Sequence, residues 1–142
     1  MPMIDIYAPA GTFADTAQLA ADAATTVMAV EGVPDLSMFR DNTAAFVHEL
    51  PPGSFSDVNG NAHHVRVQVL TNAGALTREQ QVAVVAQLTD LVVRAAGDDS
   101  LADRTWVLLT EAVPGGWGLL GHAHTNEELV AAARAEIAKS AG

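Results

Sequence analysis

The sequence predicts an α/β (α+β) fold in which two fused β-α-β units form one four-stranded mixed sheet. Two helices cover one face of this sheet, and a further helix ends the chain. Three observations predict the fold: strand-like alternation of apolar residues, helix starts marked by capping-box patterns, and a second half that repeats the order of the first. Matching positions lie 61, 62 and 63 residues apart, as in Ile4 and Val65, Glu49 and Glu111, and Gly53 and Gly116. We therefore expect a single domain, residues 1–142, with repeat units at 2–61 and 62–121 and the last helix within 122–142.

The first unit is predicted to run strand, helix, strand. Residues 4–7 alternate apolar and polar, and residues 12–15 resemble a capping box that opens an Ala-rich helix to about residue 29. Its expected apolar stripe is Phe13, Ala17, Ala20, Ala24, Val27 and Met28. Gly32 and Pro34 stop the helix, because Gly takes the left-handed cap position and Pro cannot continue the hydrogen-bond ladder. Residues 43–50 form the second strand.

The second unit shows the same order, and a final helix follows it. Residues 64–70 alternate, a capping box at 77–80 opens a helix to about residue 96, and residues 104–111 form a strand. The inward side chains of this helix are expected to be Val82, Val85, Leu88 and Val92. A third capping box at 125–128 opens an amphipathic helix with Leu129, Ala133 and Ile137 on one side.

The connections predict how the units assemble. A strand-helix-strand crossover almost always returns the second strand parallel to the first and right-handed. Both long helices then lie on one face of the sheet, and the other face is left open. Because a domain needs two packed layers, we expect the open face to be buried by neighbouring subunits or by the terminal helix. Arg66 on the third strand is expected to pair with Asp5 if their strands are neighbours.

The composition excludes several classes of partner and site. The chain has 17 Asp and Glu against 7 Lys and Arg, a net charge of −10, and so lacks the clustered cations that bind nucleic acid. It has no cysteine, which excludes disulfides, thiolate catalysis and cysteine-ligated metals. No basic segment leads into an apolar run at the N-terminus, and no run approaches the ~20 apolar residues of a membrane span. We expect a cytoplasmic protein with neither nucleic acid nor membrane as a partner.

The candidate chemistry begins at Pro2. Methionine removal is efficient before a small residue, so the mature chain is expected to start with a prolyl secondary amine. An α-amino group has a pKa of about 7.7–8.0, and an apolar pocket or nearby cations lower it, which leaves a neutral base near pH 7. The proline ring also fixes the direction of this amine. Many chains nevertheless have Pro after Met only because it is tolerated there.

The five histidines suggest no metal site by their spacing. His122 and His124 have same-face strand spacing and His63 is adjacent to His64, but no further ligand follows at a recognised interval. We expect neither a metal nor another cofactor. His48, in the second predicted strand, is either a histidine on a partly exposed face or a second acid or base near the pocket.

The order of these features resembles the tautomerase superfamily over residues 2 to about 121. Thr110-Glu111 followed by Gly116-Trp117-Gly118 and Gly121 looks like the strand-2 and hairpin region of 4-oxalocrotonate tautomerase. Asn72-Ala73-Gly74 followed by Glu79-Gln80 looks like its strand-1 to helix turn. Gly32-Val33-Pro34 with Pro52-Gly53 is similar to the fused-dimer members, including malonate semialdehyde decarboxylase-type chains.

The resemblance implies an enzyme in which Pro2 is the general base, or in some members a general acid, for keto–enol proton transfer on a small carbonyl acid. It also implies a homotrimer. The family uses arginines to hold the substrate carboxylate, and here the sequence departs from the pattern. Thr12, Ala75, Ala44 and Trp106 stand where arginines are often found.

The remaining site assignments leave alternatives open. Arg40 is our first candidate for carboxylate binding, against a surface ion pair with Asp41. Trp117 either walls the pocket or packs as an ordinary large residue, and Trp106 either makes the pocket more apolar or belongs to the core. The alternative function is a non-catalytic small-ligand-binding or assembly protein, which retention of Met1 and the missing arginines would favour.

Overall fold

The computed structural model describes residues 1–142 of the chain. In chain order the elements are β1 (Met3–Pro9), α1 (Thr16–Glu31), α2 (Ser37–Arg40), β2 (Ala44–Leu50), β3 (Val65–Thr71), α3 (Arg78–Ala96), the 3₁₀ helix η1 (Asp99–Asp103), β4 (Thr105–Glu111), β5 (Trp117–Leu119), β6 (His122–His124) and α4 (Asn126–Ser140). The predicted strand-helix-strand order of both units is therefore confirmed, as is the C-terminal helix.

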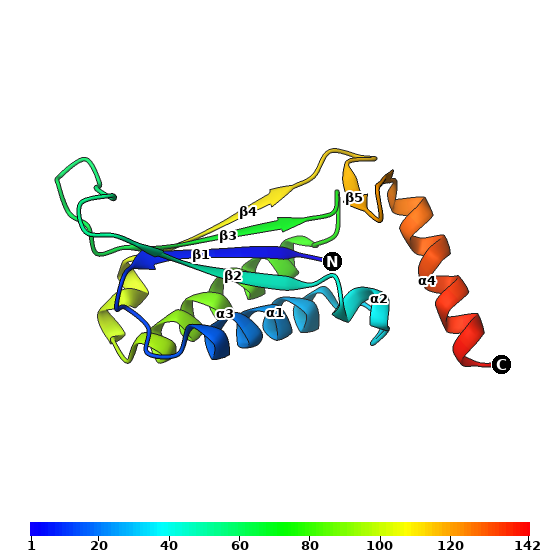
Figure 1. The fold of residues 1–142 in the computed structure, drawn as a ribbon, viewed down its shortest axis with the longest axis horizontal. Helices are drawn as coiled ribbons and strands as arrows, with labels where there is room; N and C mark the ends of the chain where they lie inside the picture. Colours follow the sequence, from blue (N-terminus) through cyan, green and yellow to red (C-terminus); the bar gives the residue numbers. More distant parts are fainter.

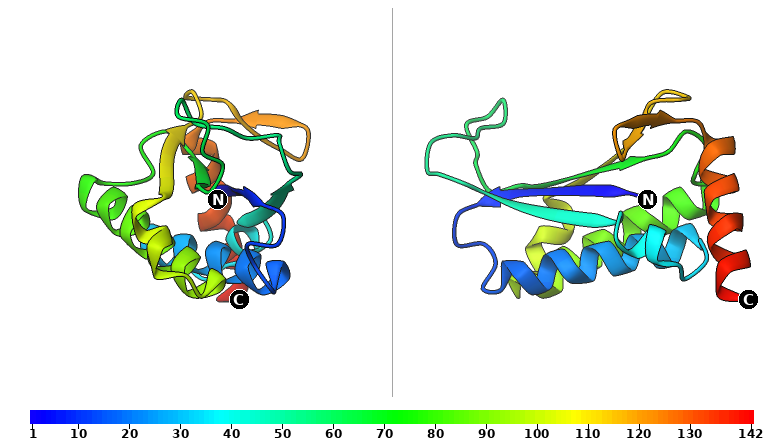
Figure 2. Two further views of the ribbon diagram at one scale, coloured as in Figure 1. Left: turned by 90° about the vertical axis from the view of Figure 1, so that its left-hand side faces the viewer. Right: turned by 45° about the vertical axis from the view of Figure 1, so that its right-hand side comes forward.

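A four-stranded mixed sheet forms the centre of the molecule, in the order β2-β1-β3-β4. β1 is parallel to β2, β3 is parallel to β4, and the two units meet through the antiparallel pair β1 and β3. Figure 1 and the left view of Figure 2 show α1 and α3 side by side beneath one face of this sheet. Because β1 and β3 run in opposite directions, the start of β1 lies beside the end of β3.

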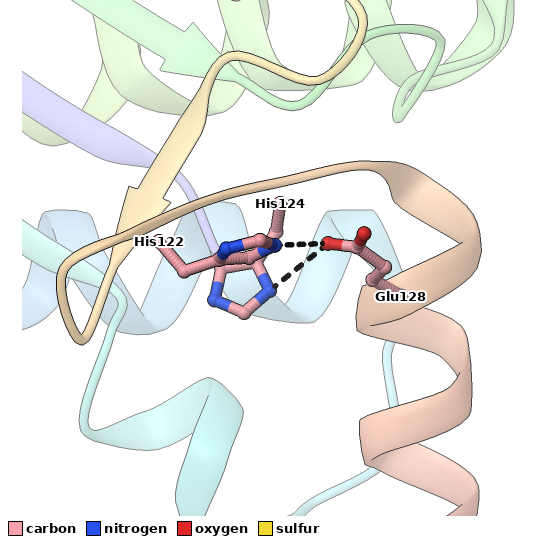
Figure 3. Close-up of side chains that lie close together, drawn as sticks. All are labelled: His122, His124 and Glu128. Carbon is pink, nitrogen blue, oxygen red and sulfur yellow. Dashed lines mark hydrogen bonds and ion pairs between the residues drawn. The ribbon is translucent and has the colours of Figure 1, made fainter.

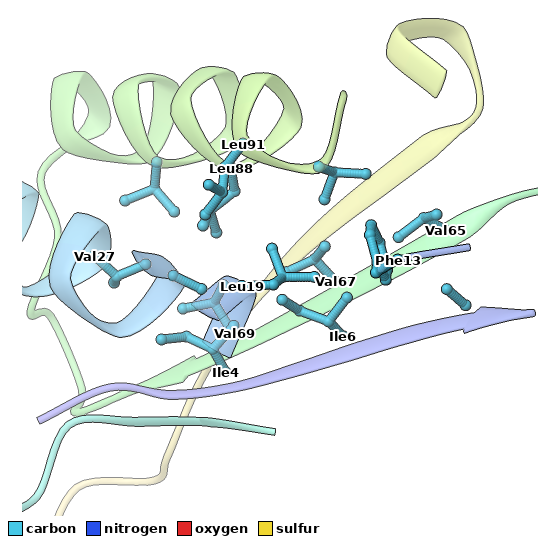
Figure 4. Close-up of a cluster of buried hydrophobic side chains, with 14 of the residues drawn as sticks. Ile4, Ile6, Phe13, Leu19, Val27, Val65, Val67, Val69, Leu88 and Leu91 are labelled. Atoms are coloured by element: carbon cyan, nitrogen blue, oxygen red, sulfur yellow. The ribbon is translucent and has the colours of Figure 1, made fainter. Parts of the chain in front are cut away.

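The main core fills the space between the sheet and the two long helices (Figure 4). Alternate residues of the central strands point into it, because successive side chains of a strand face opposite sides. The fully buried members are Ile4, Ile6, Val65, Val67 and Val69 from the strands and Leu19, Ala23, Val27, Val84, Leu88 and Val92 from the helices. Burying each large aliphatic side chain stabilises the fold by about 1.5–3 kcal/mol.

The start and the inner face of α1 differ from the sequence prediction. Asp15, rather than Thr12, caps the helix by accepting a hydrogen bond from the Gln18 backbone N–H. The Thr12 hydroxyl is used in the preceding turn, where it donates to the Pro9 carbonyl at 2.6 Å. The buried stripe is Leu19, Ala23 and Val27. Alanines fill most of this helix, and their small side chains do not indicate which face is buried.

The inner face of α3 was predicted correctly only in part. Leu88 and Val92 are buried, together with Val84 and Leu91. Val82 and Val85 instead lie on the outer side of the helix, 53% and 37% exposed. Val82 is two residues from Val84, and two positions on an α-helix lie almost on opposite faces.

The sheet face opposite α1 and α3 is open and partly apolar. Phe46, Trp106 and Leu108 project from it and are 41–51% exposed. On this face the Asp5 carboxylate pairs with His48 at 2.6 Å. The predicted pair between Asp5 and Arg66 is therefore wrong, because the register places Asp5 opposite Gln68 and Arg66 opposite Tyr7.

A second, smaller apolar cluster lies at the N-terminal end of the sheet. It joins Met1, Phe39, Trp117, Leu129 and Ala133. In Figure 1 and the right view of Figure 2, α2, the β5–β6 hairpin and α4 gather at the end where the chain begins. No helix has the length and apolar character needed to cross a membrane.

Candidate functional site

A pocket of about 430 Å³ lies where the chain begins, at the end of the sheet that α4 covers. Met1 lines it together with the end of α1, the segment leading to α2, the turn from β3 to α3, and one side of α4. These parts meet because β1 starts beside the end of β3, while α4 returns across the same end of the sheet. The repeat units therefore supply one wall of the pocket and the C-terminal helix supplies the other.

The first two residues are buried, and the first of them, Met1, lines this pocket. Met1 is 1% exposed, and its terminal ammonium group lies 3.1 Å from the Glu31 carboxylate. Pro2 is also fully buried, and its carbonyl accepts a hydrogen bond from the Ala44 N–H at 3.2 Å. This bond extends the pairing of β1 with β2 back to Pro2, so the backbone holds the proline ring in place.

Glu31 is the one anionic side chain in the wall of the pocket. It is the last residue of α1, and its side chain is only 6% exposed. One carboxylate oxygen accepts from the Met1 ammonium group, and the other is buried with no hydrogen-bond partner. A buried carboxylate oxygen without a partner is costly, so the site has capacity for one further donor.

The turn from β3 to α3 contributes a second polar group. The side-chain nitrogen of Asn72 is buried without a hydrogen-bond partner and borders the pocket. Gly74 has φ of +68°, a left-handed conformation that favours glycine, and it bends the turn around the cavity. Asn126 at the start of α4 donates to the Ala73 carbonyl at 2.7 Å, which fastens α4 to this turn.

α4 provides the apolar wall and the one cation. Leu129 and Ala133 are buried against Met1 and Phe39. Arg134 is the only cationic side chain that lines the pocket, and it takes part in no ion pair. The pocket thus combines an apolar lining with an anion next to the chain start, an unpaired amide donor and a free guanidinium group. Such a set suits a small molecule with a carboxylate and a polar carbonyl.

The predicted site residues are divided between this pocket and other places. Pro2 is buried directly after Met1, which lines the pocket, but Pro2 itself does not line it. Trp117 packs in the cluster behind the pocket wall, 7% exposed. Arg40 lies on a neighbouring groove formed with α1, where it pairs with Asp35 at 2.8 Å rather than with Asp41. Trp106 lies on the open sheet face, stacked on His64 with ring centroids 4.2 Å apart.

Within one subunit, Trp106 lies far in space from Pro2. It pairs with Arg66 across β3 and β4, and Arg66 pairs with Tyr7 across β1. Tyr7 is five residues from Pro2, or about 17 Å along an extended strand. His48 is next to Tyr7 in the register, so it too lies away from the pocket.

Three carboxyl groups outside the pocket have lowered pKa values. A hydrogen bond from His122 lowers the pKa of Glu128 in α4, with help from the Thr125 backbone N–H. Backbone hydrogen bonding by Asn61 lowers the pKa of Asp57, and the Ser100 hydroxyl does the same for the pKa of Asp98. Asp57 and Asp98 belong to the opposite end of the sheet, so they take no part in the pocket's chemistry.

Sequence reasoning missed three polar residues of the pocket, namely Glu31, Asn72 and Arg134. Glu31 ends α1 and Arg134 lies in α4, and neither belongs to a motif that singles it out in the sequence. A usable signal was present for Asn72, since it lies in the turn that supported the family resemblance. For the other two, no local pattern shows that α4 folds back across the start of β1.

Comparison with known proteins identifies the fold. No protein-family model and no curated protein matches the chain. Among solved structures, a fused 4-OT determined as a symmetric trimer has a TM-score of 0.72 and 18% identity, covering 89% of this chain and 98% of its own. Pt0534, inactivated by 2-oxo-3-pentynoate, has a TM-score of 0.69 and 22% identity over 84% of this chain and 93% of its own.

Malonate semialdehyde decarboxylase is a third similar structure, with a TM-score of 0.64 and 21% identity over 92% of this chain and 98% of its own. These structures are tautomerase-superfamily enzymes. At such identities the likeness concerns the fold, and this chain has the tautomerase-superfamily fold that its sequence predicted.

Proposed function

We propose that the protein is a tautomerase-like enzyme in which Pro2, freed by removal of Met1, transfers a proton in the keto–enol conversion of a small carbonyl acid. The observation behind this proposal is the position of Met1. Met1 lines the pocket, and the Pro2 nitrogen is bonded directly to the Met1 carbonyl carbon. Removal of Met1 therefore opens the ring nitrogen to the pocket and adds the volume of a methionine to it.

The proposed reaction is a proton shift with no net gain or loss of atoms. The neutral Pro2 nitrogen takes a proton from the carbon next to the substrate carbonyl, and the C–H electron pair forms the enol double bond. The carbonyl oxygen then gains a proton. Ketonisation runs the same steps in reverse, with the protonated nitrogen giving its proton to carbon. Positioned acid–base catalysis of this kind contributes about 10²–10⁴-fold to the rate.

Arg134 and Asn72 are the residues we assign to substrate binding. Arg134 is unpaired and can meet a carboxylate with two parallel hydrogen bonds. The buried Asn72 amide nitrogen has a free donor for the carbonyl oxygen, where negative charge develops in the enolate. Arg40, our first candidate from the sequence, is paired with Asp35 on another groove, so we assign the carboxylate to Arg134 instead.

Glu31 is proposed to control the charge of the Pro2 amine. It already binds the terminal ammonium group of the chain at 3.1 Å, and only three bonds separate the Met1 nitrogen from the Pro2 nitrogen. After processing, this carboxylate would be the acidic group nearest the new terminus and could accept a hydrogen bond from the protonated amine. Trp117 and Leu129 keep the amine in apolar surroundings by excluding water from this end of the sheet.

Assembly as a homotrimer is part of the same proposal. The open sheet face exposes Phe46, Trp106 and Leu108, and this chain supplies no second layer to cover them. A similar fused 4-OT was determined as a symmetric trimer. Analytical ultracentrifugation should give the mass of three chains of 14.8 kDa, and the mass of one chain would contradict this assignment.

A second candidate function follows from the buried ion pair of Met1. If Met1 remains, the Pro2 nitrogen is an amide without a basic lone pair, and the Met1 side chain fills part of the cluster behind the pocket. The protein would then be a non-catalytic ligand-binding or assembly protein. The ion pair with Glu31 and the 1% exposure of Met1 favour this candidate, because both stabilise the unprocessed chain.

The two candidates are separated by comparing processed and unprocessed protein. We would produce the chain with and without excess methionine aminopeptidase and measure the fraction lacking Met1 by intact mass. Ketonisation of phenylenolpyruvate, followed by ultraviolet absorption, should increase in proportion to that fraction. Equal turnover by the two forms would refute the role of Pro2, and a chain that resists processing would support the binding protein.

A further inference from the structure

Two histidines and a glutamate come together where the β5–β6 hairpin meets the start of α4 (Figure 3). The cluster consists of His122, His124 and Glu128, and one ligand atom from each lies within 4.8 Å of the others. His122 Nε2 is 2.8 Å and His124 Nδ1 is 3.5 Å from the same carboxylate oxygen, Glu128 Oε2. The three side chains therefore converge on one point, and nothing in the proposed proton transfer uses them.

His124 is oriented as a metal-binding histidine is. Its Nε2 contacts the Leu119 carbonyl at 3.0 Å, and a carbonyl can only accept, so Nε2 must carry the proton. In the neutral ring Nδ1 is then a bare lone pair, directed at a carboxylate oxygen that is also an acceptor. Two facing acceptors repel each other unless a proton or a metal cation lies between them. Donation of the second ring N–H to a backbone carbonyl is the usual outer bond of a histidine ligand.

Two of the three ligand distances already fit coordination. Two ligands about 2.1 Å from one ion are about 3.4 Å apart at a tetrahedral angle and about 3.0 Å apart at a right angle. The observed 3.5 Å and 2.8 Å from Glu128 Oε2 to the two histidines are close to these values. The ligand atoms of the cluster spread over up to 4.8 Å, so the widest pair must move closer together when an ion binds. His122 and Glu128 are 60% and 46% exposed, so water can reach the site and complete the coordination shell.

We propose that His122, His124 and Glu128 bind one divalent transition-metal ion, of which Zn²⁺ is the natural probe. Imidazole and carboxylate form a donor set that zinc accepts, whereas Mg²⁺ and Ca²⁺ prefer oxygen ligands alone. The spacing His-x-His-x₃-Glu is not one of the common zinc patterns, which is why the sequence alone predicted no metal. The site depends on the hairpin turning back so that β6 leads directly into α4.

The ion would fasten the hairpin to the helix that walls the pocket. His124 lies opposite Trp117 in the hairpin register, and Trp117 packs with Leu129, the residue after Glu128. A metal held by both elements therefore restrains two members of the apolar cluster behind the pocket. This role is structural, and it holds whether or not Pro2 is catalytic.

The test is a Zn²⁺ titration of tag-free protein by isothermal calorimetry. We expect one Zn²⁺ per chain and a rise in melting temperature with Zn²⁺ that Ca²⁺ does not produce. Glu128→Gln and His122→Gln should each weaken binding by more than about 10-fold, since losing even an outer partner of a ligand commonly costs about 10- to 100-fold. Gln at position 128 preserves the capping box, so that variant should remain folded.

His63→Gln is the matched control, because His63 is exposed and outside the cluster. It should bind Zn²⁺ as the unmodified protein does. In NMR spectra, only the imidazole signals of His122 and His124 should shift at one equivalent of Zn²⁺. The proposal is overturned if no Zn²⁺ binds, if Glu128→Gln binds as tightly as the unmodified chain, or if His63→Gln alone loses the site.

Discussion

The two ends of the sheet are built from matching segments, yet they differ in what covers them. At one end Met1 and Pro2 precede β1 and are buried under α4. At the other end His63 and His64 precede β3, and His63 matches Pro2 at the 61-residue spacing that relates Ile4 to Val65. His63 is exposed, and Arg104 donates to its carbonyl.

The covering segments explain this difference. At the end of the sheet where β3 begins, residues 51–64 connect β2 to β3, and Phe55 of this connection packs edge-on against Trp106. No long helix crosses this end (Figure 1). The first end receives α2, the β5–β6 hairpin and α4. The 3₁₀ helix η1 occupies the place of α2 in the second unit, whereas the hairpin and α4 have no counterpart there. Glu136 of α4 accepts hydrogen bonds from the first N–H groups of α2, which joins the added C-terminal helix to the first unit. The repeat thus supplies a scaffold with two similar ends, and the added segments turn one of them into a pocket.

The largest expected effect comes from replacing the residues that precede the two matching strands, β1 and β3. In protein lacking the first methionine, Pro2→Ala should reduce phenylenolpyruvate ketonisation by about 10²–10⁴-fold, because a primary amine replaces the fixed ring nitrogen. His63→Ala, at the equivalent position of the other end, should leave turnover unchanged. If both substitutions reduce turnover equally, the ends are functionally alike and the comparison fails.

Weakening the packing of α4 against the start of the chain should have a smaller but measurable effect on the free energy of unfolding. Leu129 is 7% exposed in the cluster that joins α4 to Met1 and Trp117. Leu129→Ala should lower the free energy of unfolding by about 2–3 kcal/mol, at the low end for a buried leucine because it borders an existing cavity. Leu120→Ala, at a leucine that is 94% exposed, is the control and should change it by less than about 0.5 kcal/mol. Urea unfolding followed by circular dichroism measures both, and equal losses would show that α4 does not seal this end.

The scaffold could be predicted from the sequence because its signals are local. Alternation in β1 and β3, the capping box at Thr77 and the glycine that ends α3 each mark an element within a few residues. The crossover rule then predicted the parallel pairing within each unit, whereas the antiparallel pairing of β1 with β3 was left open. Errors arose where local signals were weak, as in the Ala-rich α1, or where two valine positions of α3 were assigned to the inner face without knowledge of its rotation.

The site was less accessible to sequence reasoning because its residues meet only through long-range folding. Glu31 contacts the chain start across 30 positions, and Arg134 reaches the same pocket from the last helix. The sequence therefore favours Arg40 as the carboxylate-binding arginine, because Arg40 lies just before β2, but in the structure Arg40 pairs with Asp35. Trp106 was assigned by its matching position in the repeat, and the register puts that position at the opposite end of the sheet.

The smallest expected effect is on substrate affinity. It compares Arg134, which lines the pocket, with Arg40, which lies on the neighbouring groove beside α1. A hydrogen bond to a charged group contributes about 1.5–3 kcal/mol, so Arg134→Ala should raise KM for a carboxylate substrate by about 10- to 100-fold while kcat changes less. Arg134→Lys should recover part of the affinity, since lysine keeps the charge but not the planar pair of donors. Arg40→Ala should leave KM unchanged, because Arg40 is held by Asp35 outside the pocket. Steady-state kinetics of the processed protein decide between them, and a rise in KM for Arg40→Ala alone would move the carboxylate site to the groove beside α1.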